Sequence, residues 1–125
     1  MSEKKDALGD LAGQKCLPCS GGEPQATSAE IEKLREQVPD WELIQVEGVR
    51  RLRRTFSFRD FASAMEFARQ VGAAAESQGH HPRVTFEWGR TTVTWWTHKI
   101  GGLHHNDFIM AARTDRIFRE TGGSG

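Results

Sequence analysis

Residues 76–107 read ESQGHHPRVTFEWGRTTVTWWTHKIGGLHHND, and the rest of the chain is arranged around this stretch. It contains a predicted helix end, two predicted strands and the start of a further helix. Gly79 suits the position just after a helix, where a positive φ is needed. Pro82 disfavours helix at His81. His80 and His81 are therefore expected on an extended backbone that leads into a strand.

All histidines of the protein lie in this stretch, at positions 80, 81, 98, 104 and 105. Histidine is the side chain whose ordinary pKa lies near neutral pH, so this gathering indicates proton-transfer chemistry. His104 and His105 are at the predicted start of the last helix. We interpret these two as solvent-facing residues outside the chemistry.

The two strands predicted at residues 84–88 and 91–97 form a hairpin. Gly89 as the first residue of a two-residue loop with Arg90 suits a type II′ turn. Trp88 would then face Thr91, and the same register extended outward would place His81 opposite His98. Directly opposed residues have Cβ atoms about 5 Å apart, so this register predicts two adjacent imidazoles.

The remaining chain supplies the rest of a sheet and its helices. Thr27-Ser28-Ala29-Glu30 is a capping-box pattern that begins a helix. Residues 41–47 and 50–58 alternate as strands around a turn at 47–48. Residues 60–78 form the principal helix, and 104–119 the last. The predicted fold class is α+β, in the order α-β-β-α-β-β-α, with a four-stranded antiparallel sheet covered by helices on one face.

The arginines at positions 50, 51, 53 and 54 have two interpretations. A run of this kind is compatible with a phosphate or nucleic-acid patch. A solvated strand face, or an edge strand protected by charge, is the commoner cause, and we favour it.

Length and composition limit the possible classes of protein. The 125 residues are enough for one domain, and 17 basic against 17 acidic residues argue against a general nucleic-acid binder. No apolar run is long enough to span a bilayer and no secretory signal is visible, so we expect a cytoplasmic protein. We divide the chain into a flexible N-terminal tail (1–26), a folded domain (27–119) and a disordered C-terminus (120–125).

Cys16 and Cys19 form a C-x-x-C pair in the predicted tail. We interpret them as reduced thiols, because no second pair or nearby histidine completes a zinc site. Zinc shared between subunits and a reversible disulfide are the alternatives.

Three roles are compatible with His80, His81, His98 and Asp107: structural, metal-binding and catalytic. The histidines could be structural, or they could hold zinc or iron. No acidic residue recurs at a ligand spacing with them, which weakens the metal interpretation. Neutral and protonated imidazoles coexist near pH 7, so metal-free acid–base catalysis is favoured.

At these residues the sequence resembles the pterin-4a-carbinolamine dehydratase family, over residues 28–118. It is especially similar to bacterial members that accompany phenylalanine hydroxylase. The likeness depends on a multi-point pattern: Glu76-x-x-x-His80-His81-Pro82, Trp88, His98 and Asp107.

The resemblance implies a hydro-lyase that dehydrates 4a-hydroxytetrahydrobiopterin, the pterin 4a-carbinolamine, to quinonoid dihydropterin. Such an enzyme recycles the pterin cofactor of aromatic amino acid hydroxylases. The positions that match the family's active-site histidines are His80, His81 and His98. We expect His80 and His98 to transfer protons and His81 to help bind the pterin.

The resemblance also implies supporting residues and partners. Asp107 would orient a histidine or bind substrate, and Glu76 and Trp96 would contact or orient the pterin. No metal or organic cofactor is expected, and neither is a nucleic acid or membrane partner. A homodimer or homotetramer with a functional link to a hydroxylase is expected. The alternative is a non-catalytic interaction protein, similar to a Rubisco assembly chaperone or a transcription-factor dimerisation cofactor.

Overall fold

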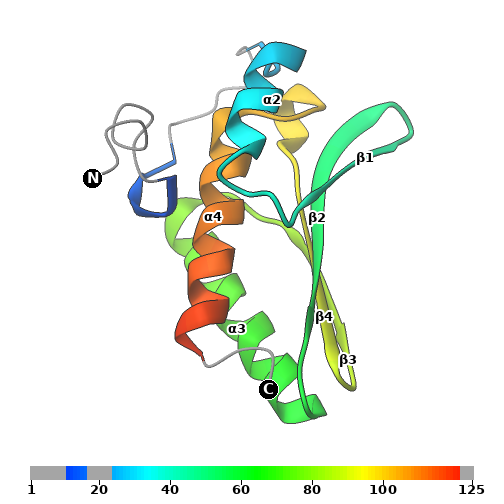
Figure 1. The fold of residues 1–125 in the computed structure, drawn as a ribbon, viewed down its shortest axis with the longest axis vertical. Coiled ribbons are helices and arrows are strands. Elements are labelled where there is room, and N and C mark those ends of the chain that lie inside the picture. The colour runs from blue at the N-terminus through cyan, green and yellow to red at the C-terminus, as the bar shows by residue number, and fades with distance from the viewer. Residues whose placement is uncertain (1–10, 17–23, 122–125) are drawn as a thin grey trace.

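The computed structural model describes residues 11–16 and 24–121 (Figure 1). These residues form an α+β domain in which helices cover one face of a four-stranded antiparallel sheet, as the sequence predicts. In chain order the elements are the 3₁₀ helix η1 (Leu11–Gly13), α2 (Ser28–Arg35), β1 (Glu42–Val46), β2 (Val49–Ser57), α3 (Phe61–Gln78), β3 (Arg83–Glu87), β4 (Arg90–Trp95), the 3₁₀ helix η2 (His98–Ile100) and α4 (His105–Glu120).

The strands lie in the order β1-β2-β4-β3, so β1 and β3 are the two edges of the sheet. The β1–β2 hairpin turns at Glu47 and Gly48, as predicted, because Val46 pairs with Val49. Both turn residues have positive φ angles, 51° and 82°. A two-residue loop with two positive φ angles is a type I′ turn, whose twist matches that of the flanking strands.

The β3–β4 hairpin turns one position earlier than predicted. Glu87 pairs with Arg90, so the two-residue loop is Trp88-Gly89 and not Gly89-Arg90. Gly89 has a φ of 85°, and its carbonyl accepts the N–H of Phe58 at 2.9 Å. The loop after β2 therefore helps to hold Gly89 as the second turn residue, a contact that the hairpin sequence does not contain.

The predicted pairing of this hairpin is consequently wrong. Thr91 pairs with Phe86 instead of Trp88, a shift of two residues along β3. The predicted juxtaposition of His81 and His98 depended on the same register, so it fails with it.

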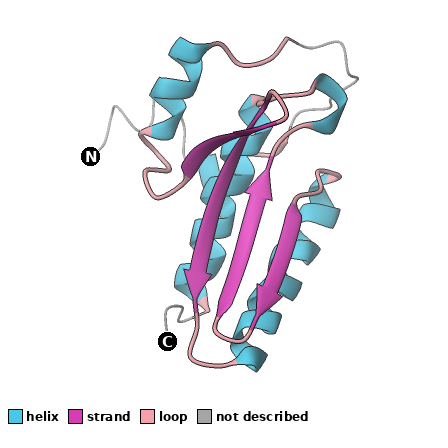
Figure 2. Cartoon of the chain, turned by 90° about the vertical axis from the view of Figure 1, so that its right-hand side faces the viewer, coloured by secondary structure: helices cyan, strands magenta, loops and turns pink. Residues whose placement is uncertain are grey.

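α3 and α4 lie against one face of the sheet, and the other face is open (Figures 1 and 2). Leu52 and Phe56 point inward from β2 and are buried, as their alternation predicts. The Thr91 hydroxyl on β4 donates to the Ala64 carbonyl of α3 at 2.8 Å. No helix in the described part of the chain is long and apolar enough to cross a membrane.

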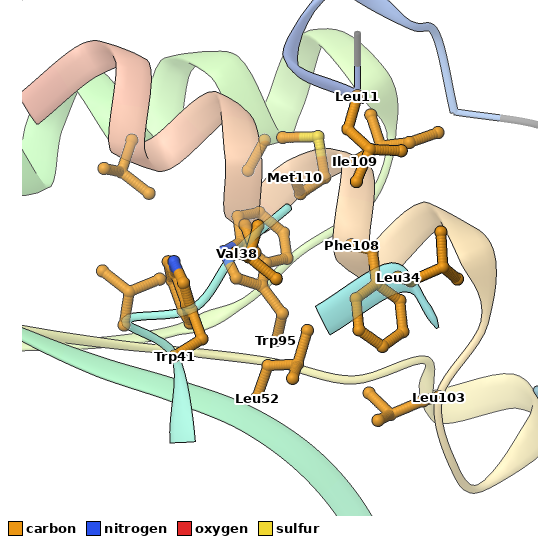
Figure 3. Close-up of a cluster of buried hydrophobic side chains, with 14 of the residues drawn as sticks. Leu11, Leu34, Val38, Trp41, Leu52, Trp95, Leu103, Phe108, Ile109 and Met110 are labelled. Carbon is orange, nitrogen blue, oxygen red and sulfur yellow. The ribbon is translucent and has the colours of Figure 1, made fainter. Parts of the chain in front are cut away.

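The core lies between the sheet and these helices (Figure 3). Its largest fully buried side chains include Trp41, Trp95 and Phe108. The Trp41 indole N–H donates to Asp115 at 2.9 Å, and Arg54 donates to the same oxygen at 2.6 Å. This buried polar group is therefore satisfied within the core.

The capping box predicted at the start of α2 is present. The Thr27 hydroxyl accepts the Glu30 N–H at 3.1 Å, and the Glu30 carboxylate accepts the Thr27 N–H at 2.7 Å. Ile31 and Leu34 are buried. The helix is thus held over the core through these two apolar side chains, one helical turn apart.

Residues 11–16 lie in the range predicted to be a flexible tail, yet they pack against α4. Leu11 is fully buried. The Arg113 guanidinium of α4 donates to the carbonyls of Ala12, at 3.0 Å, and Gln14. Burial of one leucine and satisfaction of one arginine explain the order of this segment, which composition alone does not indicate.

The same segment carries Cys16. Its backbone N–H donates to the Gln78 side chain at 2.9 Å, and burial raises the pKa of the thiol to about 11. Cys16 is therefore a protonated thiol near neutral pH. The predicted Cys16–Cys19 pair cannot be compared further, because Cys19 lies outside the described residues.

Candidate active site

The C-terminus of α3 determines where His80 lies. Gly79 adopts the left-handed conformation predicted for it, with φ 65° and ψ 26°. The His80 N–H donates back to the Ala75 carbonyl and the Gly79 N–H to the Glu76 carbonyl, both at 3.1 Å. These bonds close the helix in a Schellman arrangement, so His80 leaves α3 at a defined position.

His80 is bound to Asp107, the third residue of α4. His80 Nε2 lies 2.6 Å from Asp107 Oδ1, and Asp107 is fully buried. Asp107 Oδ2 accepts the Thr97 hydroxyl at 2.8 Å and the His104 N–H at 2.9 Å. These contacts satisfy the buried carboxylate and set its orientation. One side chain thus joins the end of α3, the end of β4 and the start of α4.

The His80 ring is also held by packing. It stacks on Trp95, with ring centroids 5.4 Å apart and planes inclined by 28°. The Trp95 indole N–H donates to the Thr114 hydroxyl at 3.2 Å, which fixes the orientation of the ring on which His80 stacks. The His80 side chain is 12% exposed, so it is restrained but reachable from solvent.

The corrected hairpin register explains which residue faces His80. The last observed pair towards the histidines is Arg83 with Thr94. Extended outward, the same register sets His80 opposite Thr97, and both of these side chains bond to Asp107. His98 follows Thr97 directly, so His80 and His98 belong to one end of the sheet.

His98 lies beside Trp96 at this end. The two ring centroids are 4.5 Å apart, and the Arg51 guanidinium lies over the Trp96 ring at 3.9 Å. His98 is exposed, in the first position of η2. Arg51 covers one side of the indole, so a flat ligand would reach Trp96 from that side only if Arg51 moved.

His81 and Glu76 form a surface pair. His81 Nε2 lies 2.9 Å from Glu76 Oε1, and their side chains are 63% and 81% exposed. His81 follows His80 directly in the chain, but neither His81 nor Glu76 bonds to Asp107. His81 is therefore freer than His80 to turn towards a ligand.

His104 and His105 are structural rather than simply solvent-facing, and both are partly buried. His104 Nδ1 accepts the Asn106 N–H at 3.1 Å and so caps α4. His105 Nε2 lies 3.1 Å from the Gln14 side chain. Burial, followed by the nearby charge of His104, lowers the pKa of His105.

These two histidines border a pocket of about 410 Å³. The pocket is separate from the candidate catalytic histidines, none of which lines it. Its lining residues are Pro24, Gln25, Ala26, Glu30, Lys33, Leu34, His104 and His105.

Sequence reasoning missed three residues of the site: Thr97, Trp95 and Arg51. Thr97 precedes His98 directly, but only the correct register pairs it with His80. Trp95 lies in the strand predicted at 91–97, but the sequence contains nothing that links it to His80. Alternation along β2 did place Arg51 on the polar face, but the sequence contains nothing that links it to Trp96.

Among residues 11–16 and 24–121, no three His, Cys, Asp or Glu side chains are arranged to hold a metal ion. That the protein needs no metal or organic cofactor stays a prediction.

Fold and site together define an α+β domain whose sheet ends in a histidine held by a buried carboxylate. The chain belongs to the pterin 4 alpha carbinolamine dehydratase family, whose model matches residues 24–117. This confirms the resemblance found in the sequence.

Relatives with about half their residues identical cover most of the chain. A Syntrophotalea carbinolica protein, provisionally named pterin-4-alpha-carbinolamine dehydratase, is 54% identical over 107 residues, which are 86% of this chain and 96% of that protein. A Chlorobium limicola protein with the same provisional name is 53% identical over 107 residues, 86% of this chain and 95% of its own.

Solved structures share the fold. A transcriptional coactivator/pterin dehydratase from Brucella melitensis has a TM-score of 0.67 and 30% identity, covering 74% of this chain and 97% of that one. A pterin dehydratase-like protein described as a RuBisCO assembly factor in the alpha-carboxysome has a TM-score of 0.53 and 22% identity. The match covers 62% of this chain and 88% of that one. The second likeness shows the fold alone.

Proposed function

We propose that the protein is a hydro-lyase that dehydrates 4a-hydroxytetrahydrobiopterin, or a closely related pterin 4a-carbinolamine, to quinonoid dihydropterin. In this reaction the C4a–O bond breaks, a ring nitrogen loses a proton, a C=N bond forms and water leaves. The step needs an acid for the departing hydroxyl and a base for the ring proton. Family membership supports the substrate class.

The observation that carries the proposal is the contact of His80 with Asp107. A fully buried carboxylate at 2.6 Å orients the ring and can stabilise the imidazolium that forms when His80 takes a proton. If Nε2 donates to Asp107, Nδ1 is left as the basic nitrogen. The packing on Trp95 would keep this nitrogen in place between turnovers.

His98 is the proposed partner of His80 in proton transfer. It is exposed and lies at the same end of the sheet, where it can protonate a leaving hydroxyl without first breaking a buried hydrogen bond. His81, released from Glu76, would bind and orient the pterin. Trp96 would form a side wall of the site, in contact with His98.

The test generates the carbinolamine with an aromatic amino acid hydroxylase and follows its decay optically, with and without the protein. We expect clear acceleration over the spontaneous rate. His80→Ala should lower kcat/KM by about 100-fold or more, as loss of a positioned acid or base does.

His105→Gln is the matched control, because it removes a histidine of the same stretch that bonds to Gln14 and not to Asp107. Its rate should stay near that of the native protein. No acceleration by the native protein would refute the dehydratase. An undiminished rate in a folded His80→Ala variant, checked by circular dichroism, would refute the role of His80.

The remaining predictions about partners and location belong to this proposal. The open edges of β1 and β3 are physically suited to a homodimer or homotetramer. We keep a functional link to a hydroxylase and a cytoplasmic location as predictions. A purely non-catalytic scaffold is less favoured, because it leaves the His80–Asp107 contact without a use.

A further inference from the structure

The open face of the sheet carries arginines beside the candidate site. Arg53 and Arg83 flank Thr94 from the two neighbouring strands, and Arg51 lies two residues from Arg53. Alternate residues of a strand point to the same face, so these side chains share the face that no helix covers (Figure 2). Thr94 is only 6% exposed, although no helix covers this face.

The positive charges on this face are not equally neutralised. Arg53 is paired with Glu42 at 3.0 Å, and Arg90, at the far end of β4, is paired with Glu87. Within the described residues, Arg51 and Arg83 have neither an ion pair nor a hydrogen bond, and Arg51 Nε is buried without a partner. Two cations therefore lack counter-charges at the end of the sheet that carries the histidines.

Arg51 is held in place although it has no acidic partner. Its guanidinium lies 3.9 Å from the Trp96 ring, and the Trp96 ring lies 4.5 Å from that of His98. A cation over an aromatic face is attracted by the ring and loses mobility. The positive charge of Arg51 is thus separated from His98, a proposed proton-transfer residue, by the side chain of Trp96 alone.

We propose that Arg51, assisted by Arg83, binds an anionic group on the side chain at C6 of the pterin. This makes a pterin with a phosphate or carboxylate on that side chain the preferred substrate class. The inference rests on the proposed function. In the pterin ring, C6 is separated from the reacting C4a by one nitrogen. A side chain at C6 therefore begins close to the reaction centre and can extend over the open sheet face towards Arg51.

The geometry of a guanidinium supports this assignment. Its N–H groups form a planar fork that matches phosphate and carboxylate oxygens, and Arg51 has no acidic side chain that already fills the fork. The mixed charges elsewhere on the face, where arginines are paired, would not attract an anion in the same way. The overall neutral charge of the chain makes this local excess a feature of the site rather than of the whole surface.

The experiment compares four carbinolamines, those of 6-methyltetrahydropterin, tetrahydroneopterin, tetrahydroneopterin monophosphate and tetrahydrofolate. Inhibition by 7,8-dihydroneopterin and its monophosphate gives a second readout that does not require turnover of each compound. We expect kcat/KM and affinity to be about fivefold higher for an anionic compound than for its neutral counterpart at low salt. In about 0.5 M NaCl the preference should shrink, because exposed charges are screened.

Arg51→Gln should bring the ratio of anionic to neutral kcat/KM close to one, and Arg83→Gln should lower it less. Arg51→Lys should retain part of the preference. Arg90→Gln is the matched control, since it removes an arginine that is already paired at the opposite end of the strand, and its ratio should equal that of the native protein.

A higher rate with the monophosphate identifies phosphate as the anion, and a higher rate with the folate compound identifies carboxylate. Equal rates for neutral and anionic compounds would overturn the inference while leaving the dehydratase intact. So would a preference that survives in Arg51→Gln. Failure to accelerate even the 6-methyl compound would instead refute the dehydratase, and the inhibitor affinities would then decide the Arg51 assignment by themselves.

Discussion

Asp107 is the residue on which most contacts of the candidate site converge. Its buried carboxylate accepts from His80, Thr97 and the backbone of His104. Removing the acceptor leaves the buried Thr97 hydroxyl without its partner and takes a partner from His80 and from the His104 backbone, which are partly buried. At the scale of the single residue, Asp107 therefore has both a structural and a chemical role.

Asp107→Ala should lower the free energy of unfolding by about 3 kcal/mol, because buried donors are left unsatisfied. Urea titration measures this loss. Asp60→Ala is the matched control. Asp60 also caps a helix, accepting the Ser63 N–H at 2.8 Å, but it is only partly buried, so its loss should be smaller. Equal losses in the two variants would show that burial of Asp107 has no special energetic weight.

At the residue scale the sequence identified the candidate histidines and Asp107, but not how they connect. The pattern around His80, His81 and Pro82 marks them, and Asp107 falls in the first turn of the helix predicted at 104–119. Thr97 and Trp95 were missed because both act on His80 through long-range packing. Their roles depend on a register that the residues themselves do not encode locally.

The C-terminus of α3 is the element that sets the position of His80. A residue with a side chain in the left-handed conformation of Gly79 is strained, although no atom lies within 4 Å of where its Cβ would be. Gly79→Ala should therefore lower the free energy of unfolding by about 1 kcal/mol. It should also lower the dehydration rate, because the departure of His80 from the helix would change.

Gly72→Ala in the same helix is the control for this prediction. Gly72 also has free space around its Cβ position, but its φ is not positive. This substitution should raise stability by up to about 1 kcal/mol, since alanine favours helix more than glycine does. Urea unfolding of both variants compares them. A stabilised Gly79→Ala variant would contradict the assigned conformation.

At the element scale, helices and strands were predictable because their periodicity and caps are local. The capping box of α2, the Glu47-Gly48 turn and the glycine end of α3 all agree with the structure. The second hairpin was not predictable, since Trp88-Gly89 and Gly89-Arg90 both place a glycine in a two-residue loop. The deciding contact comes from Phe58, which is distant in sequence.

At the scale of the whole molecule, the contact of the N-terminal segment with His105 makes the free energy of unfolding depend on pH. His105 bonds to Gln14, and burial lowers the pKa of His105 below its usual value of about 6.5. The nearby charge of His104 acts in the same direction, and Glu30 opposes it. His105 therefore binds a proton more readily in the unfolded state than in the folded state. Its contribution to the free energy of unfolding falls as the pH drops through about 6.5.

The native protein should therefore lose more stability than His105→Gln when the pH is lowered from about 7.5 to about 5.5. Urea titrations of both proteins at several pH values measure the difference. All other titrating groups are common to the two proteins, so they cancel in the comparison. Parallel pH profiles would show that His105 does not contribute this linkage.

At the scale of the whole molecule, the sequence predicted the α+β class and the helices on one sheet face. It did not predict that residues 11–16 pack on α4. The flanking residues are polar and glycine-rich, so the buried Leu11 and Ala12 and the carbonyls bound by Arg113 leave no periodic signal.

The bond from the His104 amide to Asp107 makes one backbone hydrogen a reporter of the site. That hydrogen can exchange with deuterium only when its bond to Asp107 Oδ2 opens, and the other oxygen of the same carboxylate holds His80. The exchange rate at this position therefore reports how often the start of α4 opens around Asp107 in the resting protein. Reading it requires no substrate, so the lifetime of the arrangement can be followed independently of turnover.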